Sequence, residues 1–124
     1  MIDKIVLEKL EYQKVLQYIS KYCVTEKSKS NTLSLSPHKE LEQSVIEGEL
    51  VNESKEILIK QYQPPLEYLP DLDELLHQSR IEGAVLDGKK ILEILKLAVI
   101  SRNLVQYLRN NVEIAPKLGK LSNR

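Results

Sequence analysis

The side chains best suited to proton transfer and metal binding near neutral pH are two histidines, His38 and His77. Neither has a cysteine or a second histidine beside it at metal-ligand spacing. His38 falls in the first turn of a predicted helix and His77 in a capped helix, so both are expected at the surface or partly packed. The sequence therefore predicts no metal ligand and no catalytic histidine.

The stretch GAVLDGKK, residues 83–90, is the segment closest to a phosphate-binding loop. It places glycine before a helix start with lysines nearby. It lacks the glycine spacing and the Gly-Lys-Ser/Thr ending that a phosphate cradle needs. We interpret it as a turn between two helices in which Asp87 caps the second, and we predict no cofactor-binding residue.

Carboxylates and a thiol are the remaining candidates for chemistry. Carboxylates strung along one helix, with nothing converging on them, usually form a solvated face rather than an acid–base pair or a metal site. Cys23 falls on an apolar helical stripe, where packing is expected rather than reactivity. No catalytic residue is predicted. The acidic residues are Glu40, Glu42, Glu47, Glu49, Glu53 and Glu56.

Composition favours one all-α globular domain. The chain has 124 residues, of which 42% are hydrophobic and 29% charged, and it contains no Phe or Trp. That balance allows a buried core and argues against disorder. The formal net charge is zero, so only weak binding to nucleic acid is expected of this chain. A lone cysteine, without a signal peptide or an apolar run of membrane length, predicts a cytoplasmic protein.

Hydrophobic periodicity and capping residues predict the first three helices. The stretch LEYQKVLQYISKYC carries apolar residues at three- and four-residue steps. Thr25 is the predicted N-cap of a second helix. Ser36 and Pro37 predict the start of a third helix that would run to Lys60, with Gly48 as its weakest point.

A proline-rich connector, QYQPPLEYLP, separates these helices from the rest of the chain. Asp71 and Glu74 form a capping-box pattern that predicts a fourth helix, and Gly83 is expected to end it. Asp87 then caps a long fifth helix that runs to Asn110, and APKLGKL suggests a sixth. The prediction is an all-α helical bundle of five to six helices in a single domain or subdomain, residues 1–124.

The long helix is apolar around too much of its circumference for a helix with one side in solvent. Because the shorter helices can cover only part of it, self-association is expected to cover the rest, most simply as a homodimer. The residues predicted to lie at this interface are Leu97, Ile100, Leu104 and Leu108.

The order of these segments resembles the N-terminal region of the bacterial MutS-two (MutS2) branch of the MutS family. LEYQKVLQYISKYC is similar to the opening helix of that branch. TEKSKSNTLSLSP resembles its Thr-x-x-Gly-Lys helix, except that Ser28 stands where glycine is usual. NESKEIL and the stretch from PPLEYLP to LDGKKILEI match later segments in order, so the resemblance runs from about Leu7 to Leu108.

The resemblance implies a MutS-like core or lever segment that couples an ATPase to a nucleic-acid clamp without being catalytic itself. Members of the branch are large dimeric ATPases that use ATP and Mg, often with a C-terminal Smr nuclease domain. Their assigned roles lie in DNA recombination, repair or ribosome rescue. No ATPase or Smr motif is present here, so the chain is expected to be an N-terminal piece whose main partner is the remainder of the parent chain.

Neutral charge and a broad apolar helix suit a second hypothesis equally well. The chain could be a stand-alone helical protein-interaction module. An enzyme in its own right is the third and least favoured interpretation.

Overall fold

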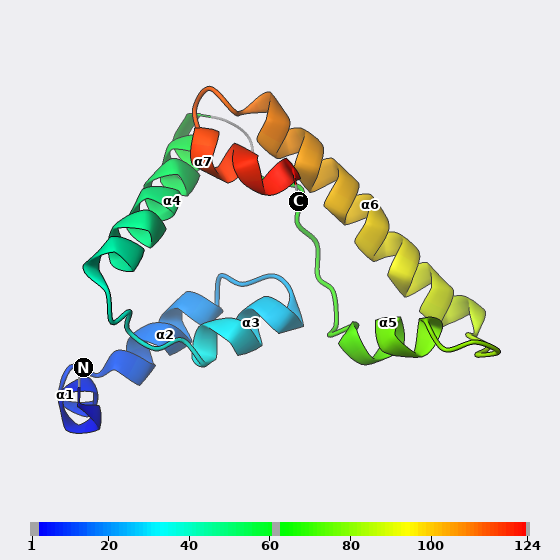
Figure 1. Cartoon of the computed structure of the whole chain (residues 1–124), viewed down its shortest axis with the longest axis horizontal. Helices are drawn as coiled ribbons and strands as arrows, with labels where there is room; N and C mark the ends of the chain where they lie inside the picture. The colour runs from blue at the N-terminus through cyan, green and yellow to red at the C-terminus, as the bar shows by residue number, and fades with distance from the viewer. Residues whose placement is uncertain (1–2, 61–62, 124) are drawn as a thin grey trace. The chain divides into compact units, whose positions relative to one another are not determined.

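The computed structural model describes residues 3–60 and 63–123, and no strand occurs among them (Figure 1). Gln61 and Tyr62, in the predicted connector, lie outside the described residues. The all-α prediction is confirmed, and a short helix before the first predicted one, α1, was not anticipated. In chain order the helices are α1 (Lys4–Lys9), α2 (Tyr12–Ser20), α3 (Glu26–Leu33), α4 (Leu41–Lys60), α5 (Asp73–Ser79), α6 (Gly88–Asn110), α7 (Pro116–Gly119) and the 3-10 helix η1 (Lys120–Asn123).

Contacts divide the chain into two compact units. Unit 1 consists of Met1–Pro37 and Glu67–Leu97, and unit 2 consists of His38–Leu66 and Ala98–Arg124. The long helix α6 contributes its first part to unit 1 and its second part to unit 2. The single domain or subdomain predicted for residues 1–124 therefore has an internal division.

In unit 1, α2 packs against α3, and the turn between them is held by local hydrogen bonds. Thr25 is the N-cap of α3, as predicted, because its hydroxyl accepts the Ser28 N–H at 3.2 Å. Cys23 is half-buried, with its Sγ atom 3.3 Å from Thr32 Oγ1. Leu16 is the buried residue of α2, whereas Tyr22 is 87% exposed, so α3 covers only part of the predicted stripe.

The start of α5 differs from the predicted capping box. Asp71 accepts a hydrogen bond from the Asp73 N–H at 3.0 Å, but the helix begins only at Asp73. Asp71 therefore lies one residue before the N-cap position, which Leu72 occupies, and its spacing to Glu74 has no capping-box geometry. The helix ends at Ser79, and Gly83, with φ of +80°, forms a turn after it instead of ending it.

The start of α4 was also predicted too early. The helix begins at Leu41, and its first backbone hydrogen bond runs from the Ser44 N–H to the Glu40 carbonyl. Before it, the Leu35 carbonyl accepts a hydrogen bond from the Tyr12 hydroxyl at 3.2 Å, which ties this stretch to α2. Ser36 and Pro37 therefore precede the helix without starting it. Gly48 does not break α4.

The core of unit 2 forms where α4, α6 and the C-terminal helices meet. Ile57, Tyr107 and Ala115 are buried together. Asn111 is buried beside them and donates a hydrogen bond from Nδ2 to the Tyr107 carbonyl at 2.8 Å. Ile57 of α4 is buried, whereas Leu41 at the start of the same helix is 80% exposed. Partly buried residues complete the cluster: Leu104, Leu108, Ile114 and Leu118.

Candidate functional site

The side chains that could take part in catalysis or bind a metal do not lie close together in the part of the chain that the structure describes. His38 and His77 are both exposed, and they belong to different units. No group of three or more His, Cys, Asp or Glu side chains that could hold a metal ion occurs in residues 3–60 and 63–123.

The turn that resembles a phosphate loop is closed by the chain's own carboxylate. Asp87 Oδ1 accepts a hydrogen bond from the Lys90 N–H at 2.9 Å, and the Asp87 carbonyl accepts from the Ile91 N–H at 3.1 Å. The predicted cap of α6 is therefore confirmed. The carboxylate thereby meets an N–H group of the first turn of α6, at the kind of helix N-terminus where phosphates bind in other proteins.

Three glutamates of α4 do more than face solvent, because they form ion pairs and hydrogen bonds within unit 2. Glu49 forms an ion pair with Lys117, and Glu56 pairs with Lys60 at 3.0 Å. Glu53 accepts hydrogen bonds from the N–H groups of Lys117 at 3.2 Å and Leu118 at 2.8 Å. Sequence reasoning missed this last role, because the partners are more than 60 residues apart and no local pattern links them.

The four predicted interface residues lie along α6 with different degrees of cover. Ile100 is 7% exposed, and Leu97 is half-buried. Leu104 and Leu108 pack against the core of unit 2. Contacts within the chain therefore cover most of this face, and its role as an interface stays a prediction.

The apolar side chains that α6 leaves exposed belong mainly to its first half. The exposed fraction is 53% for Ile91, 64% for Leu92 and 55% for Leu95. These residues lie three or four positions apart or next to one another, so they share one side of the helix. This side, rather than the predicted one, is the apolar surface of α6 that remains without cover.

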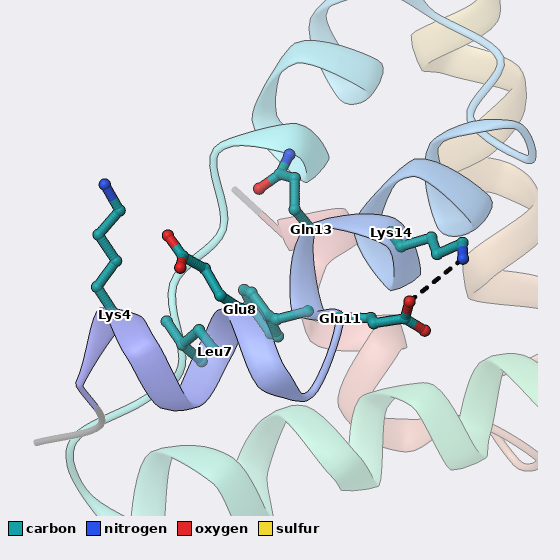
Figure 2. Close-up of a pocket in the computed structure, with 7 residues that line it drawn as sticks. Lys4, Leu7, Glu8, Glu11, Gln13 and Lys14 are labelled. Atoms are coloured by element: carbon teal, nitrogen blue, oxygen red, sulfur yellow. Dashed lines mark hydrogen bonds and ion pairs between the residues drawn. The ribbon is translucent and has the colours of Figure 1, made fainter.

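One cavity is an open depression of about 530 Å³ where α1 meets α2 (Figure 2). Leu7 lies between Lys4 and Glu8 on α1, and the side chains of Lys4 and Glu8 extend to the same side of the helix. The one ion pair drawn there joins Lys14 to Glu11 at 3.4 Å, and both side chains are exposed. The depression brings together no set of groups that could act on a substrate.

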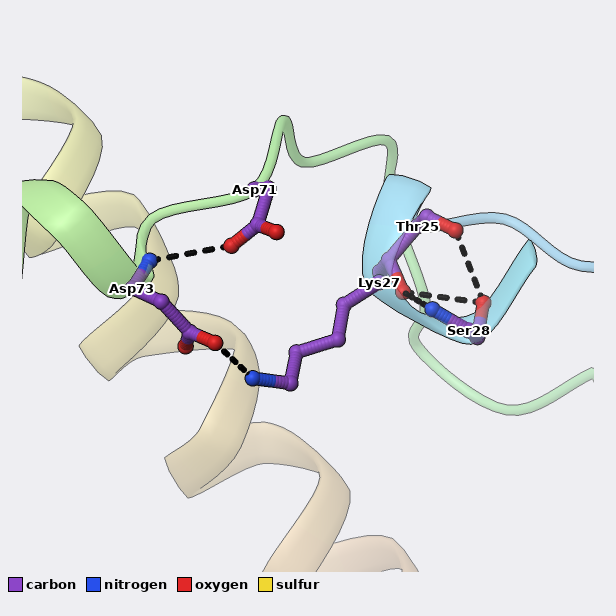
Figure 3. A network of polar contacts seen from close by, with 5 residues as sticks. All are labelled: Thr25, Lys27, Ser28, Asp71 and Asp73. Atoms are coloured by element: carbon purple, nitrogen blue, oxygen red, sulfur yellow. Dashed lines mark hydrogen bonds and ion pairs between the residues drawn. The ribbon is translucent and has the colours of Figure 1, made fainter. Parts of the chain in front are cut away.

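A second cavity, of about 320 Å³, lies between α3 and α5. Its wall includes Leu69 and Leu72, which are buried, and the Glu26 N–H donates to the Leu69 carbonyl at 3.0 Å. At its rim, the Lys27 ammonium reaches across to the Asp73 carboxylate (Figure 3). This contact is largely what raises the pKa of Lys27, and the charge of Asp71 adds to it. The pair fastens α3 to α5.

Comparison with known proteins identifies the relationship. The chain is 32% identical to endonuclease MutS2 of Clostridium beijerinckii over 115 residues, which cover 91% of this chain and 14% of that protein. It is 29% identical to endonuclease MutS2 of Clostridium botulinum strain Eklund 17B, over 98% of this chain and 16% of that protein. The chain is related to the MutS2 proteins. The resemblance found in the sequence is thereby confirmed.

The MutS2 relationship extends over nearly all of this chain but over little of each relative. Endonuclease MutS2 of Clostridium perfringens strain 13 is 28% identical, over 87% of this chain and 14% of that protein. The chain thus spans about one seventh of the length of the curated relatives it matches. No family model matches the chain, and no solved structure does. Within the described residues, no helix is both long and apolar enough to cross a membrane.

Proposed function

We propose that this chain forms part of the helical core or lever of a MutS2-like ATPase that acts on nucleic acid. The observation that carries the proposal is the match to endonuclease MutS2 proteins over 87–98% of the chain. In this role the segment positions other parts of the protein and is not itself catalytic. The corresponding process would be DNA recombination, repair or ribosome rescue in the cytoplasm.

Helix α6 suits a lever. Its 23 residues give a length of about 34 Å at the usual helical rise. It also contributes residues to both compact units. ATP and Mg would bind in a different part of the parent protein, since the turn before α6 lacks the Gly-Lys-Ser/Thr ending of a phosphate loop.

A chimera tests the proposal. The matching segment of the Clostridium beijerinckii endonuclease MutS2 is replaced by this chain, and ATP hydrolysis is measured with and without nucleic acid. We expect hydrolysis to be retained. Val99→Pro, which breaks α6 in its interior, should weaken the response to nucleic acid and leave basal hydrolysis intact, whereas Val99→Ala should preserve both. A chimera without ATP hydrolysis would contradict the proposal.

The large exposed apolar side chains favour a second candidate, a stand-alone helical protein-interaction module. Val85 is 92% exposed, Tyr22 87% and Leu41 80%, which leaves apolar surface on several elements for a protein partner. The gene sequence beyond the codon for residue 124 distinguishes the two candidate functions. A reading frame that continues into a phosphate-binding loop favours the MutS2-like parent, and a stop codon near residue 124 favours the separate module.

A further inference from the structure

The second half of α6 has a local charge that the neutral total hides. Between Ile94 and Val112 the sequence contains no Asp or Glu, but it contains Lys96, Arg102 and Arg109. Lys96 is paired with Glu67 at 3.6 Å. The two arginines make no ion pair or hydrogen bond through their side chains with any of the residues that the structure describes.

These two arginines lie on one side of the helix, opposite the core. They are seven residues apart, so two helical turns bring them to the same side at a separation of about 10 Å along the axis. Leu104 and Tyr107 point the other way, into the core of unit 2. Both arginines are exposed, and they border a shallow depression of about 470 Å³ on the outer surface of α6.

Uncharged polar groups and the apolar Val105 complete this surface. Ser101, Gln106 and Asn110 line the same depression, and none of their side chains makes a hydrogen bond within the described residues. We call this set of five residues, Ser101, Arg102, Gln106, Arg109 and Asn110, the outer polar face of α6. It presents two guanidinium groups with hydroxyl and amide groups beside them, and it contains no carboxylate.

A chain of phosphates fits this arrangement. Arginine binds phosphate through two parallel N–H donors, and serine, asparagine and glutamine commonly donate to phosphate oxygens of nucleic acid. The two guanidinium groups, about 10 Å apart along α6 and on flexible side chains, can reach two phosphates of the same backbone.

The acidic helix of a second copy fits less well. A two-fold dimer could bring α4 of one copy against the outer polar face of the other. However, Glu49, Glu53 and Glu56 are already engaged with Lys117, with the N–H groups of α7 and with Lys60. A partner surface built on these three glutamates would have to give up these contacts, so only the glutamates nearer the start of α4 could meet the arginines without such a loss.

We propose that the outer polar face of α6 binds the phosphate backbone of a nucleic-acid duplex. The proposal rests on the proposed function in that it supplies a direct contact with the nucleic acid on which the parent would act. With only two arginines, binding by this chain is weak, independent of base sequence and sensitive to salt.

The test uses a labelled 20-base-pair DNA duplex and fluorescence anisotropy over a series of salt concentrations. We compare the chain with a double variant, Arg102→Gln with Arg109→Gln. The wild type should bind at low salt and lose affinity steeply as salt rises. The double variant should bind about tenfold more weakly at low salt, and its slope of log affinity against log salt should be smaller by about 1.8.

Lys89→Gln with Lys90→Gln is the matched control, because it removes the same charge from the first turn of the same helix. This control should remain within about twofold of the wild type. Equal losses in both double variants would mean that binding follows total charge, and absence of binding by the wild type at low salt would also overturn the proposal. The proposal would also be overturned if the double arginine variant had the same DNA affinity as the wild type but a different molecular mass, since the two arginines would then contact another copy of the chain. None of these results depends on ATP hydrolysis in the chimera, so the two proposals fail separately.

Discussion

The Glu53 carboxylate on α4 accepts a hydrogen bond from the backbone N–H of Leu118 at 2.8 Å, in the first turn of α7. The neighbouring N–H of Lys117 donates to the other carboxylate oxygen at 3.2 Å. Ala115, at the N-cap position of α7, has no side chain that could do this. A residue of a distant helix therefore provides the N-terminal cap of α7, and it fastens the C-terminal segment to α4.

Removal of this cap should destabilise unit 2. We expect Glu53→Ala to lower the free energy of unfolding by about 1–2 kcal/mol, because two donors lose a charged acceptor. Urea denaturation gives the value. Glu47→Ala, on an exposed part of the same helix, is the control and should change stability by less than about 0.5 kcal/mol. Equal effects of the two substitutions would show that Glu53 acts only through its charge.

The glycines of α4 and α7 should respond to alanine in opposite directions. A Cβ atom at Gly119 would lie 2.9 Å from Val112 Cγ2, so Gly119→Ala should destabilise by about 1–3 kcal/mol. A Cβ atom at Gly48 would meet no atom within 4 Å, and Gly48→Ala should stabilise the helix by about 0.5–1 kcal/mol. Thermal unfolding of the two variants measures both changes. A stable Gly119→Ala variant would show that Val112 can move aside.

Backbone strain is concentrated at Glu11, between α1 and α2, where φ is +55°. Residues with a side chain pay about 1 kcal/mol in this left-handed conformation, whereas glycine adopts it readily. Glu11→Gly should therefore be more stable than Glu11→Ala by about 1 kcal/mol, although both lose the exposed pair with Lys14. Chemical denaturation measures the free energy of unfolding of the two variants. A Glu11→Ala variant more stable than Glu11→Gly would mean that α1 rearranges to relieve the strain.

The features that were predicted correctly are those set by neighbouring residues. Thr25 and Asp87 cap the helices that follow them, because a short polar side chain satisfies the free N–H groups of its own first turn. The same kind of pattern failed at Ser36, because the helix begins only at Leu41, and the stretch between them is held to α2 by the hydrogen bond from the Tyr12 hydroxyl to the Leu35 carbonyl. A contact with a residue 23 positions away is invisible to local pattern reasoning.

The side of α6 that is buried by the rest of the chain was the feature least predictable from the sequence. Periodicity showed that two sides of the helix are apolar, but it did not reveal which side would be packed. The structure packs Leu104 against the core cluster of unit 2, and it leaves Leu92 and Leu95 exposed. The Lys27–Asp73 pair is likewise a tertiary contact, and neither residue is distinguished from the other charged residues of the sequence.

The Lys27–Asp73 pair predicts a change with pH in the alkaline range. The hydrogen bond to Asp73 raises the pKa of Lys27 above its ordinary value of 10.5. Because the pKa of Lys27 is higher in the folded chain than in the unfolded chain, the charged lysine stabilises the folded state. This stabilisation is fully present below the pKa of the unfolded chain and is lost as pH rises through the pKa of the folded chain. Asp73→Asn should lower the pKa of Lys27, as measured by an NMR titration of the lysine side chain. Lys29, which pairs with Glu26, is an internal reference, and an unchanged Lys27 titration would contradict the pair.

The final prediction concerns self-association, which the sequence led us to expect through Leu97, Ile100, Leu104 and Leu108. The structure separates two sides of α6 that a substitution can test independently. Leu95 is 55% exposed, whereas Leu104 packs in the core of unit 2. A charge at Leu95 would meet solvent in the monomer, but a charge at Leu104 would have to enter apolar packing.

We expect the chain to form a homodimer at micromolar concentration, measured by light scattering. If the exposed side of α6 forms the interface, Leu95→Asp should give a monomer whose melting temperature is close to that of the wild type. Leu104→Asp should lower the melting temperature by several degrees, because it disrupts packing against the core cluster of unit 2 within one copy. A dimer that persists in Leu95→Asp but dissociates in a fully folded Leu104→Asp variant would return the interface to the side first predicted. A wild type that is monomeric at these concentrations would leave all of α6 outside any interface between copies.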